Sequence, residues 1–148
     1  MLLLGSKNTT SQVVPSLGLI NLGTVYRRYD KKSNCGFRAF DFNSTSIAFQ
    51  QSGIYHLTAT ATFTGATAGE VTVQLLINGQ AIDGAFATET ITTVDTEFRS
   101  ITIDYYILVD KDFILGSTTP IAQSISLQNT GDVDATFTSV VVNVDKNV

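Results

Sequence analysis

The 148-residue sequence has no tryptophan, one histidine, one cysteine and few charged residues. Cys35 has no second cysteine to pair with, so no disulfide can form within the chain. No apolar run is long enough to cross a membrane, and the start MLLLGSKNTT has no basic segment before its leucines, so we expect neither a transmembrane segment nor a signal peptide. Charged residues make up 15% of the chain against 43% hydrophobic. So little charge indicates that a partner covers part of the surface.

The sequence also lacks the residue patterns of common enzymes. No Gly-rich phosphate loop, zinc-ligand spacing or Ser-His-Asp order is present. His56 is the first candidate for a general base, but it lies on the threonine-rich face of a predicted strand with no nucleophile beside it. Cys35 could act as a nucleophile only if a base approached it in space, and it is expected to be a small buried hydrophobic side chain. We therefore expect no enzyme activity, no catalytic residue and no cofactor.

Clustered charges offer two further kinds of site. The loops VDKD (Asp110, Asp112) and GDVD (Asp132, Asp134) could supply oxygen ligands to calcium, but neither has the spacing of an EF-hand, and we expect no metal site. The run RRYDKK holds four of the nine basic residues. The rest of the chain is acidic and would repel a phosphate backbone, so we expect no nucleic-acid partner and no membrane partner.

The net charge of −4 conceals a division of the chain. Residues 1–40 carry six basic residues and one acid, hence +5, whereas residues 41–148 carry three and twelve, hence −9. Such parts are expected to face different neighbours, with the acidic loops at Asp95, Asp110 and Asp132 pointing away from the basic segment. We predict that residues 1–20 form an attachment arm and that residues 21–148 form the folded domain. The predicted docking residues are Val13, Val14, Leu17, Leu19, Ile20, Arg27, Arg28, Lys31 and Lys32.

Alternating apolar and polar residues predict β-strands along most of the chain. In GIYHLTATATF, one face carries Tyr55, Leu57 and alanines, and the other carries His56 and threonines. Similar alternation occurs in VTVQLLI, SITIDYYILV, QSISLQ and the closing VVVNV, and Asn78-Gly79 predicts a tight hairpin turn. No window has helical spacing, so about eight to ten short strands and no helix are expected, as in a two-sheet jelly-roll sandwich.

The stretch SIAFQQSGIYHLTATATF followed by VTVQLLINGQAI resembles the tumour-necrosis-factor-like jelly roll, which includes the complement-type globular heads. Phe49, Gly53 and Tyr55 match the family's aromatic and Gly-x-Tyr positions, and Asn-Gly at 78–79 matches its next turn. The resemblance covers residues 37–146 and implies a homotrimer with the Gly-x-Tyr strand near the threefold axis. LVDKDFILGSTTP departs from the family's Gly-Asp turn, which leaves the geometry of that loop and an axial ion open. The predicted trimer-interface residues are Tyr55, Leu57, Val140, Val142 and Val144.

A second resemblance covers most of the chain. The segments LGTVYRRYDKKSNCGFRAFDF, GIYHLTATATFTG, GEVTVQL and GAFATETI are similar to small proteins encoded in bacteriophage and prophage genomes. This resemblance implies a virion structural protein on the particle surface, a head decoration, head fibre or tail-associated knob, whose partners are other capsid or tail proteins. The alternative is a receptor- or glycan-binding adhesin for the bacterial host surface. Sugar sites often stack a ring on tryptophan or tyrosine, and the chain has no tryptophan and no tyrosine in the expected distal loops.

Overall fold

The computed structural model describes residues 2–30, 38–109 and 123–146, and within these ranges every regular element is a β-strand. No helix in them is long and apolar enough to cross a membrane. The strands are β1 (Leu2–Asn8), β2 (Gln12–Val14), β3 (Thr24–Tyr29), β4 (Phe40–Asn43), β5 (Ser46–Phe49), β6 (Gly53–Thr64), β7 (Gly69–Ile77), β8 (Gln80–Ile91), β9 (Arg99–Val109), β10 (Gln123–Asn129) and β11 (Ala135–Lys146).

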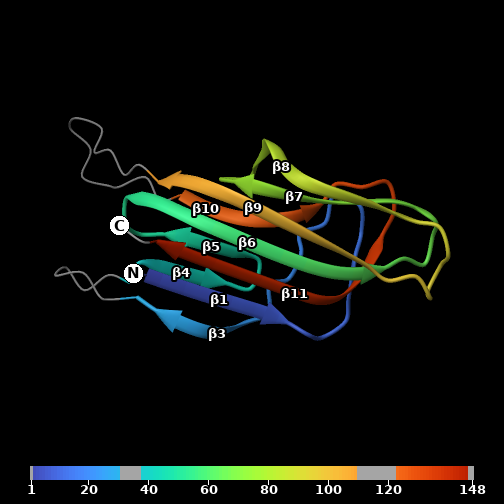
Figure 1. Cartoon of the computed structure of the whole chain (residues 1–148), viewed down its shortest axis with the longest axis horizontal. Coiled ribbons are helices and arrows are strands. Elements are labelled where there is room, and N and C mark those ends of the chain that lie inside the picture. The colour runs from blue at the N-terminus through green and yellow to red at the C-terminus, as the bar shows by residue number, and fades with distance from the viewer. Residues whose placement is uncertain (1, 31–37, 110–122, 147–148) are drawn as a thin grey trace.

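The strands form two antiparallel sheets that pack face to face (Figure 1). Sheet A has the order β3-β1-β11-β6-β9, with β2 beside the start of β11, and sheet B has the order β4-β5-β10-β7-β8. Most neighbours in each sheet are distant in the chain, and such crossing connections are typical of a jelly roll. The all-β, two-sheet fold predicted from the sequence is confirmed.

The core lies between the sheets and contains the inward residues of every long strand. On β6 these are the residues that the alternation predicted, from Tyr55 to Phe63, and all are buried. Tyr55 packs against Phe40 and Phe49 with ring centroids 5.6 and 4.5 Å away. Its hydroxyl donates a hydrogen bond to the Gln51 carbonyl, and burial raises the pKa of Tyr55 to about 12. Each large side chain buried in this way contributes about 1.5–3 kcal/mol.

Two glycine positions explain motifs in the sequence. Asn78 and Gly79 have φ values of 52° and 78° and join β7 to β8, as the Asn-Gly pair predicted, because both residues tolerate left-handed backbone. Gly53 has a φ of 149°, and a Cβ at this position would collide with the side chain of Lys146. Lys146 is flexible and could move aside, but side-chain-bearing residues rarely adopt this φ, so the backbone favours the glycine of Gly-x-Tyr where β6 begins beside the end of β11.

The N-terminal segment is part of the sandwich, which corrects the boundary predicted at residue 20. β1 lies between β3 and β11 and pairs with β11 over its whole length, from Leu2↔Lys146 to Asn8↔Val140. Leu4 is fully buried in the core. The sequence did not predict a strand here because LLLGSKN contains glycine, lysine and asparagine, which are uncommon in strands.

The predicted trimer-interface residues are also core residues. Tyr55, Leu57, Val140, Val142 and Val144 are each at most 1% exposed in the single chain, because they point toward sheet B. Their side chains cannot touch another subunit, so their assignment to an interface is corrected. A contact made by β6 or β11 has to use the alternate residues, which point away from the core.

Candidate functional site

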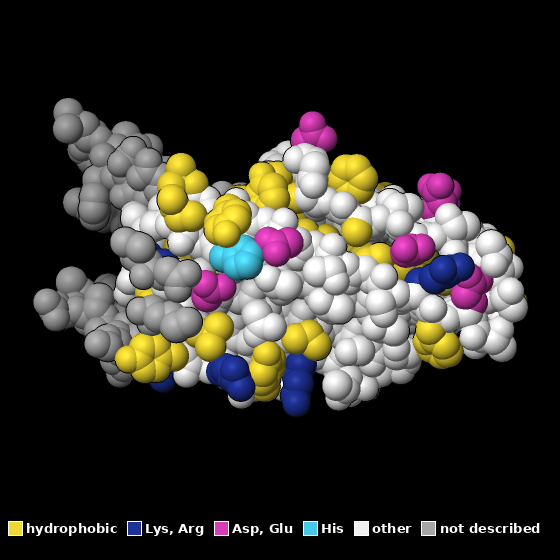
Figure 2. All heavy atoms as spheres, viewed as in Figure 1, with side chains coloured by type: hydrophobic (Ala, Val, Ile, Leu, Met, Phe, Trp, Pro, Cys, Tyr) yellow, Lys and Arg dark blue, Asp and Glu magenta, His cyan; other side chains and the backbone are white. Residues whose placement is uncertain are grey.

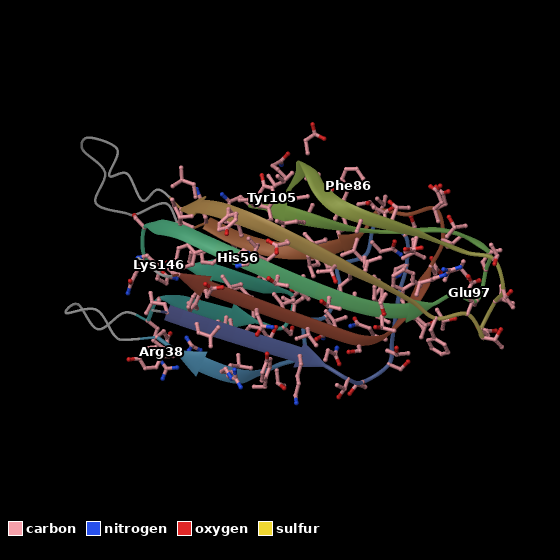
Figure 3. All side chains as sticks on the ribbon, in the orientation of Figure 1. Arg38, His56, Phe86, Glu97, Tyr105 and Lys146 are labelled. Atoms are coloured by element: carbon pink, nitrogen blue, oxygen red, sulfur yellow. The ribbon has the colours of Figure 1, made fainter. Side chains whose placement is uncertain are left out.

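The outer face of sheet A is the candidate functional surface. β6 and β9 pair in register from Gly53↔Val109 to Phe63↔Arg99, and β11 pairs with the other side of β6. Outward side chains on these three strands therefore form rows across the sheet. One row brings together Asp145, His56 and Tyr106, and the neighbouring row brings Thr58 opposite Asp104. Figure 3 shows His56 on β6, on the face turned toward the viewer.

His56 lies between two carboxylates. Its Nε2 is 2.6 Å from Asp104 Oδ1, and its Nδ1 is 3.5 Å from Asp145 Oδ1. The imidazole ring stacks on Tyr106 with a centroid distance of 4.8 Å. The hydrogen bond to Asp104, aided by the charges of Asp104 and Asp145, raises the pKa of His56 above its ordinary value. Only an imidazolium has a proton on both ring nitrogens, so this arrangement favours the charged form.

Exposed apolar side chains surround this ion-pair cluster. Ile54 is 61% exposed, and Tyr106 and Leu108 are each 68% exposed. Ile54 and Leu108 are cross-strand partners next to the His56–Tyr106 pair. Figure 2 shows hydrophobic side chains beside the single histidine on this face. We define the His56 patch as Ile54, His56, Asp104, Tyr106, Leu108 and Asp145.

The other half of β6 and β9 has a different outer surface. Thr60 faces Thr102 with hydroxyl oxygens 3.3 Å apart, and Thr62 faces Ser100 with oxygens 2.8 Å apart. These four hydroxyl side chains carry no charge, and Figure 2 shows this part of the face mostly white. The two halves of the same strands therefore differ: one is apolar and acidic, and the other is neutral and hydroxyl-rich.

The predicted docking residues are not brought together in one surface. Val14 and Ile20 are in the core, whereas Val13, Leu17 and Leu19 are 69%, 69% and 48% exposed. Arg27 is exposed. Arg28 is paired with Asp30 and donates a further hydrogen bond to the Phe40 carbonyl. Lys31 and Lys32 lie outside the described residues.

The N-terminal segment was predicted to point away from the acidic loops, but it contacts one of them, which corrects that prediction. The Ser16 amide donates to Asp134 Oδ1 at 3.1 Å, and the Ser16 hydroxyl donates to the Gly131 carbonyl at 2.6 Å. The exposed Leu17 consequently lies beside the acidic turn that precedes β11. Asp95 is in the loop between β8 and β9, with its amide bonded to the Gly65 carbonyl, and Asp110 is outside the described residues.

Two further acidic side chains in the described ranges, those of Asp134 and Glu97, have structural partners. Asp134 accepts the Ser16 amide, and the described residues hold no group of three or more His, Cys, Asp or Glu side chains placed for a metal ion. The carboxylate of Glu97 accepts hydrogen bonds from the Thr93 amide, from the Thr92 amide and hydroxyl, and from Arg99, and these bonds lower the pKa of Glu97 to about 2. Its role is to close the loop between β8 and β9. Cys35, Asp110 and Asp112 lie outside the described residues.

A polar groove lies at the end of β1, away from the His56 patch. It has a volume of about 460 Å³ and is bounded by hydroxyl and amide side chains and one lysine. Gln12 and Asn21 fix its wall, because the Asn21 amide donates to Gln12 Oε1 at 2.9 Å and Gln12 Nε2 donates to the Asn21 carbonyl at 2.8 Å. The lining residues are Lys7, Asn8, Thr9, Thr10, Ser11, Gln12, Asn21, Gly23, Thr24 and Ser44.

Sequence reasoning missed most of the His56 patch. It placed His56 on the polar face correctly, but the patch joins three strands whose pairing is not visible in the sequence. One signal was present: in SITIDYYILV the face opposite Ile101, Ile103 and Ile107 carries Tyr106 and Leu108 where polar residues are expected. Apolar residues on both faces of an edge strand indicate that the outer face is an interaction surface.

Solved structures share this fold. No protein-family model matches the sequence, and no curated protein matches it. The globular domain of zebrafish complement 1qA protein is similar with a TM-score of 0.62 and 5% identity over 100% of this chain and 98% of that one. Murine APRIL has a TM-score of 0.60 and 10% identity, with 97% and 98% covered.

A vertex protein is also among the similar structures. The PRD1 vertex protein P5 has a TM-score of 0.52 and 11% identity, with 99% of this chain and 97% of that one covered. At such low identities the likeness concerns the fold. The chain has the tumour-necrosis-factor-like, complement-type jelly-roll fold that its Gly-x-Tyr and Asn-Gly motifs predicted.

Proposed function

We propose that the protein is a non-enzymatic structural component of a phage particle, a head decoration, head fibre or tail-associated knob, and that it acts as a homotrimer. The observation that carries the proposal is the His56 patch, where three apolar side chains more than 60% exposed surround an ion-pair cluster. An exposed apolar patch of this kind is typical of a subunit interface. The fold likeness to the vertex protein of phage PRD1 supports the location on a virion.

Attachment to the particle is assigned to Val13, Leu17 and Leu19. They are the exposed apolar members of the predicted docking set. Val13 lies on β2 beside the start of β11, and Leu19 bridges to Gln128 at the end of β10, so both lie apart from the His56 patch. Burial of one such side chain contributes about 1.5–3 kcal/mol, more than the 0–1 kcal/mol of a surface ion pair. Apolar contact is therefore expected to hold the trimer on its particle.

Particle binding tests this proposal. Purified virions should contain the protein by mass spectrometry, with immunogold label on the particle surface. A variant with Val13→Asp, Leu17→Asp and Leu19→Asp should remain a folded trimer but stay in the supernatant, whereas Ser126→Asp on the outer face of sheet B should bind like the parent. Virions without the protein, or full binding by the triple variant, would contradict the proposal.

The polar groove favours a second candidate function, a receptor- or glycan-binding adhesin. Its volume of about 460 Å³ is in the range of small-molecule sites, and its hydroxyl and amide lining matches the hydrogen-bonding groups of sugars. Host cell-wall oligosaccharides should then shift the NMR signals of Thr9, Thr10 and Thr24. Such shifts, together with loss of binding in Lys7→Ala, would favour the adhesin. Unchanged spectra at millimolar sugar would exclude this role for the groove.

A further inference from the structure

The His56 patch contains the only histidine of the chain at the centre of the proposed subunit contact. Its side chain is 30% exposed, so solvent reaches it in the single chain. Both ring nitrogens face carboxylate oxygens, and the ring face lies on Tyr106. A histidine changes charge near neutral pH, so the charge at the centre of this patch depends on pH in that range.

We propose that the protonation state of His56 controls self-association, so that the copies associate tightly when the imidazole is charged and loosen when it is neutral. This inference rests on the proposed self-association through the outer face of sheet A. It assigns to that contact a pH dependence in which the protein takes up protons as it assembles.

The charged groups around His56 set the direction of the effect. From β9, Asp104 and Tyr106 contact the imidazole, and from β11, Asp145 faces its other nitrogen. Farther across the same face, β1 contributes Lys7, and β3 contributes Arg27 and Tyr29. Sheet B packs against the opposite face of sheet A and does not reach the ring. The groups in direct contact are thus two acids and a phenol.

Counting the charges of three copies shows why protonation favours assembly. With a neutral imidazole, Asp104 and Asp145 give each cluster a charge of −2, and three clusters carry −6. With an imidazolium each cluster carries −1, and three carry −3. Closing the interface removes water from these groups, which strengthens like-charge repulsion and also strengthens the attraction of His56 for its two carboxylates. Both effects favour the protonated form in the assembled state.

The experiment is analytical ultracentrifugation of the full chain between about pH 5.5 and 8.5, a range that spans the ordinary titration of a histidine. For the wild-type protein, the dissociation constant of the trimer should be at least about tenfold higher at pH 8 than at pH 6, because three protons are linked to one assembly. His56→Gln should abolish this dependence. His56→Lys keeps a positive charge and should remain trimeric across the range.

A second measurement does not depend on these variants folding. The His56 imidazole gives a single histidine signal in NMR, and its titration midpoint should be higher in the trimer than in a monomeric Leu108→Asn variant, which adds no charge beside the imidazole. Equal midpoints, or a wild-type trimer whose dissociation constant does not change with pH, would overturn the inference and leave the proposed function standing. A wild-type protein that is folded but monomeric at every pH would overturn the self-association on which the inference rests.

Discussion

The two faces of sheet A are made by the same strands but differ in how far their apolar side chains are exposed. On the inner face, Leu57 and Val142 are at most 1% exposed, whereas on the outer face Ile54 and Leu108 are more than 60% exposed. Both sets are apolar, and they alternate along the chain. Alternation assigns side chains to the two faces of a strand, whereas the position of the second sheet decides which face becomes the core. An apolar outer face is costly in water unless another subunit covers it.

Removing β1 takes residues from both faces at once and should have the largest effect. A chain without residues 1–20 loses Leu4 from the core and the hydrogen bonds between β1 and β11. We expect it to be unfolded, with loss of the β-sheet circular-dichroism signal and poorly dispersed NMR spectra. A soluble, folded product would show that residues 1–20 form the separable arm predicted from the sequence.

A charge on the inner face should unfold the chain, and the same charge on the outer face should not. Val142→Asp buries an unpaired carboxylate and should cost roughly 3–5 kcal/mol, a large part of the usual stability of a domain. Val141→Asp, one residue away, points outward opposite Lys7 and should change the free energy of unfolding by less than about 1 kcal/mol. Urea titrations of both variants measure the difference. Equal destabilisation would mean that the two faces are wrongly assigned.

The ion-pair cluster should make a small, pH-dependent contribution to the stability of a single chain. The pKa of His56 is raised in the folded state, so its stabilisation is complete below the unfolded value near 6.5 and is lost as pH rises through the folded value. Because the side chain is partly exposed, the change should be at most about 1 kcal/mol. Urea unfolding of a monomeric Leu108→Asn variant, with and without His56→Gln, separates this contribution from assembly. If the free energy of unfolding still changes with pH to the same extent in the His56→Gln variant, the pH dependence comes from other groups.

The threonine half of the outer face should be the least sensitive region. Thr60→Val keeps the shape of the side chain and removes one exposed hydroxyl contact with Thr102. The free energy of unfolding should change by less than about 0.5 kcal/mol, as for most surface substitutions. Thermal and urea unfolding measure this change. A loss above about 1 kcal/mol would show that the hydroxyl pairs stabilise sheet A.

Most of the fold could be predicted because its signals are local. The alternation from Tyr55 to Phe63 and the Asn78-Gly79 turn depend only on neighbouring residues, and the structure has both. The pairing of β1 with β11 joins the two ends of the chain, and nothing in LLLGSKN specifies it. Local reasoning therefore left the first strand outside the domain.

The candidate site was predicted less well because a strand has two faces. Val140 to Val142 is apolar on both, and the sequence does not state which face meets sheet B. The interface was consequently assigned to Val142 and its inward neighbours. His56 was placed on the correct face, but its carboxylate partners come from β9 and β11, 48 and 89 positions away. Only the sheet order brings these three side chains together.

Multi-angle light scattering tests most directly the claim that the outer face of sheet A joins copies of the chain. At micromolar concentration and about pH 6.5, the wild-type protein should have a mass of about 48 kDa, three times the 15.9 kDa chain. Leu108→Asp, within the His56 patch, should give a folded 15.9 kDa monomer, whereas Ser126→Asp on sheet B should remain a trimer. A monomeric wild-type protein, or a Leu108→Asp variant that is still trimeric, would contradict the claim.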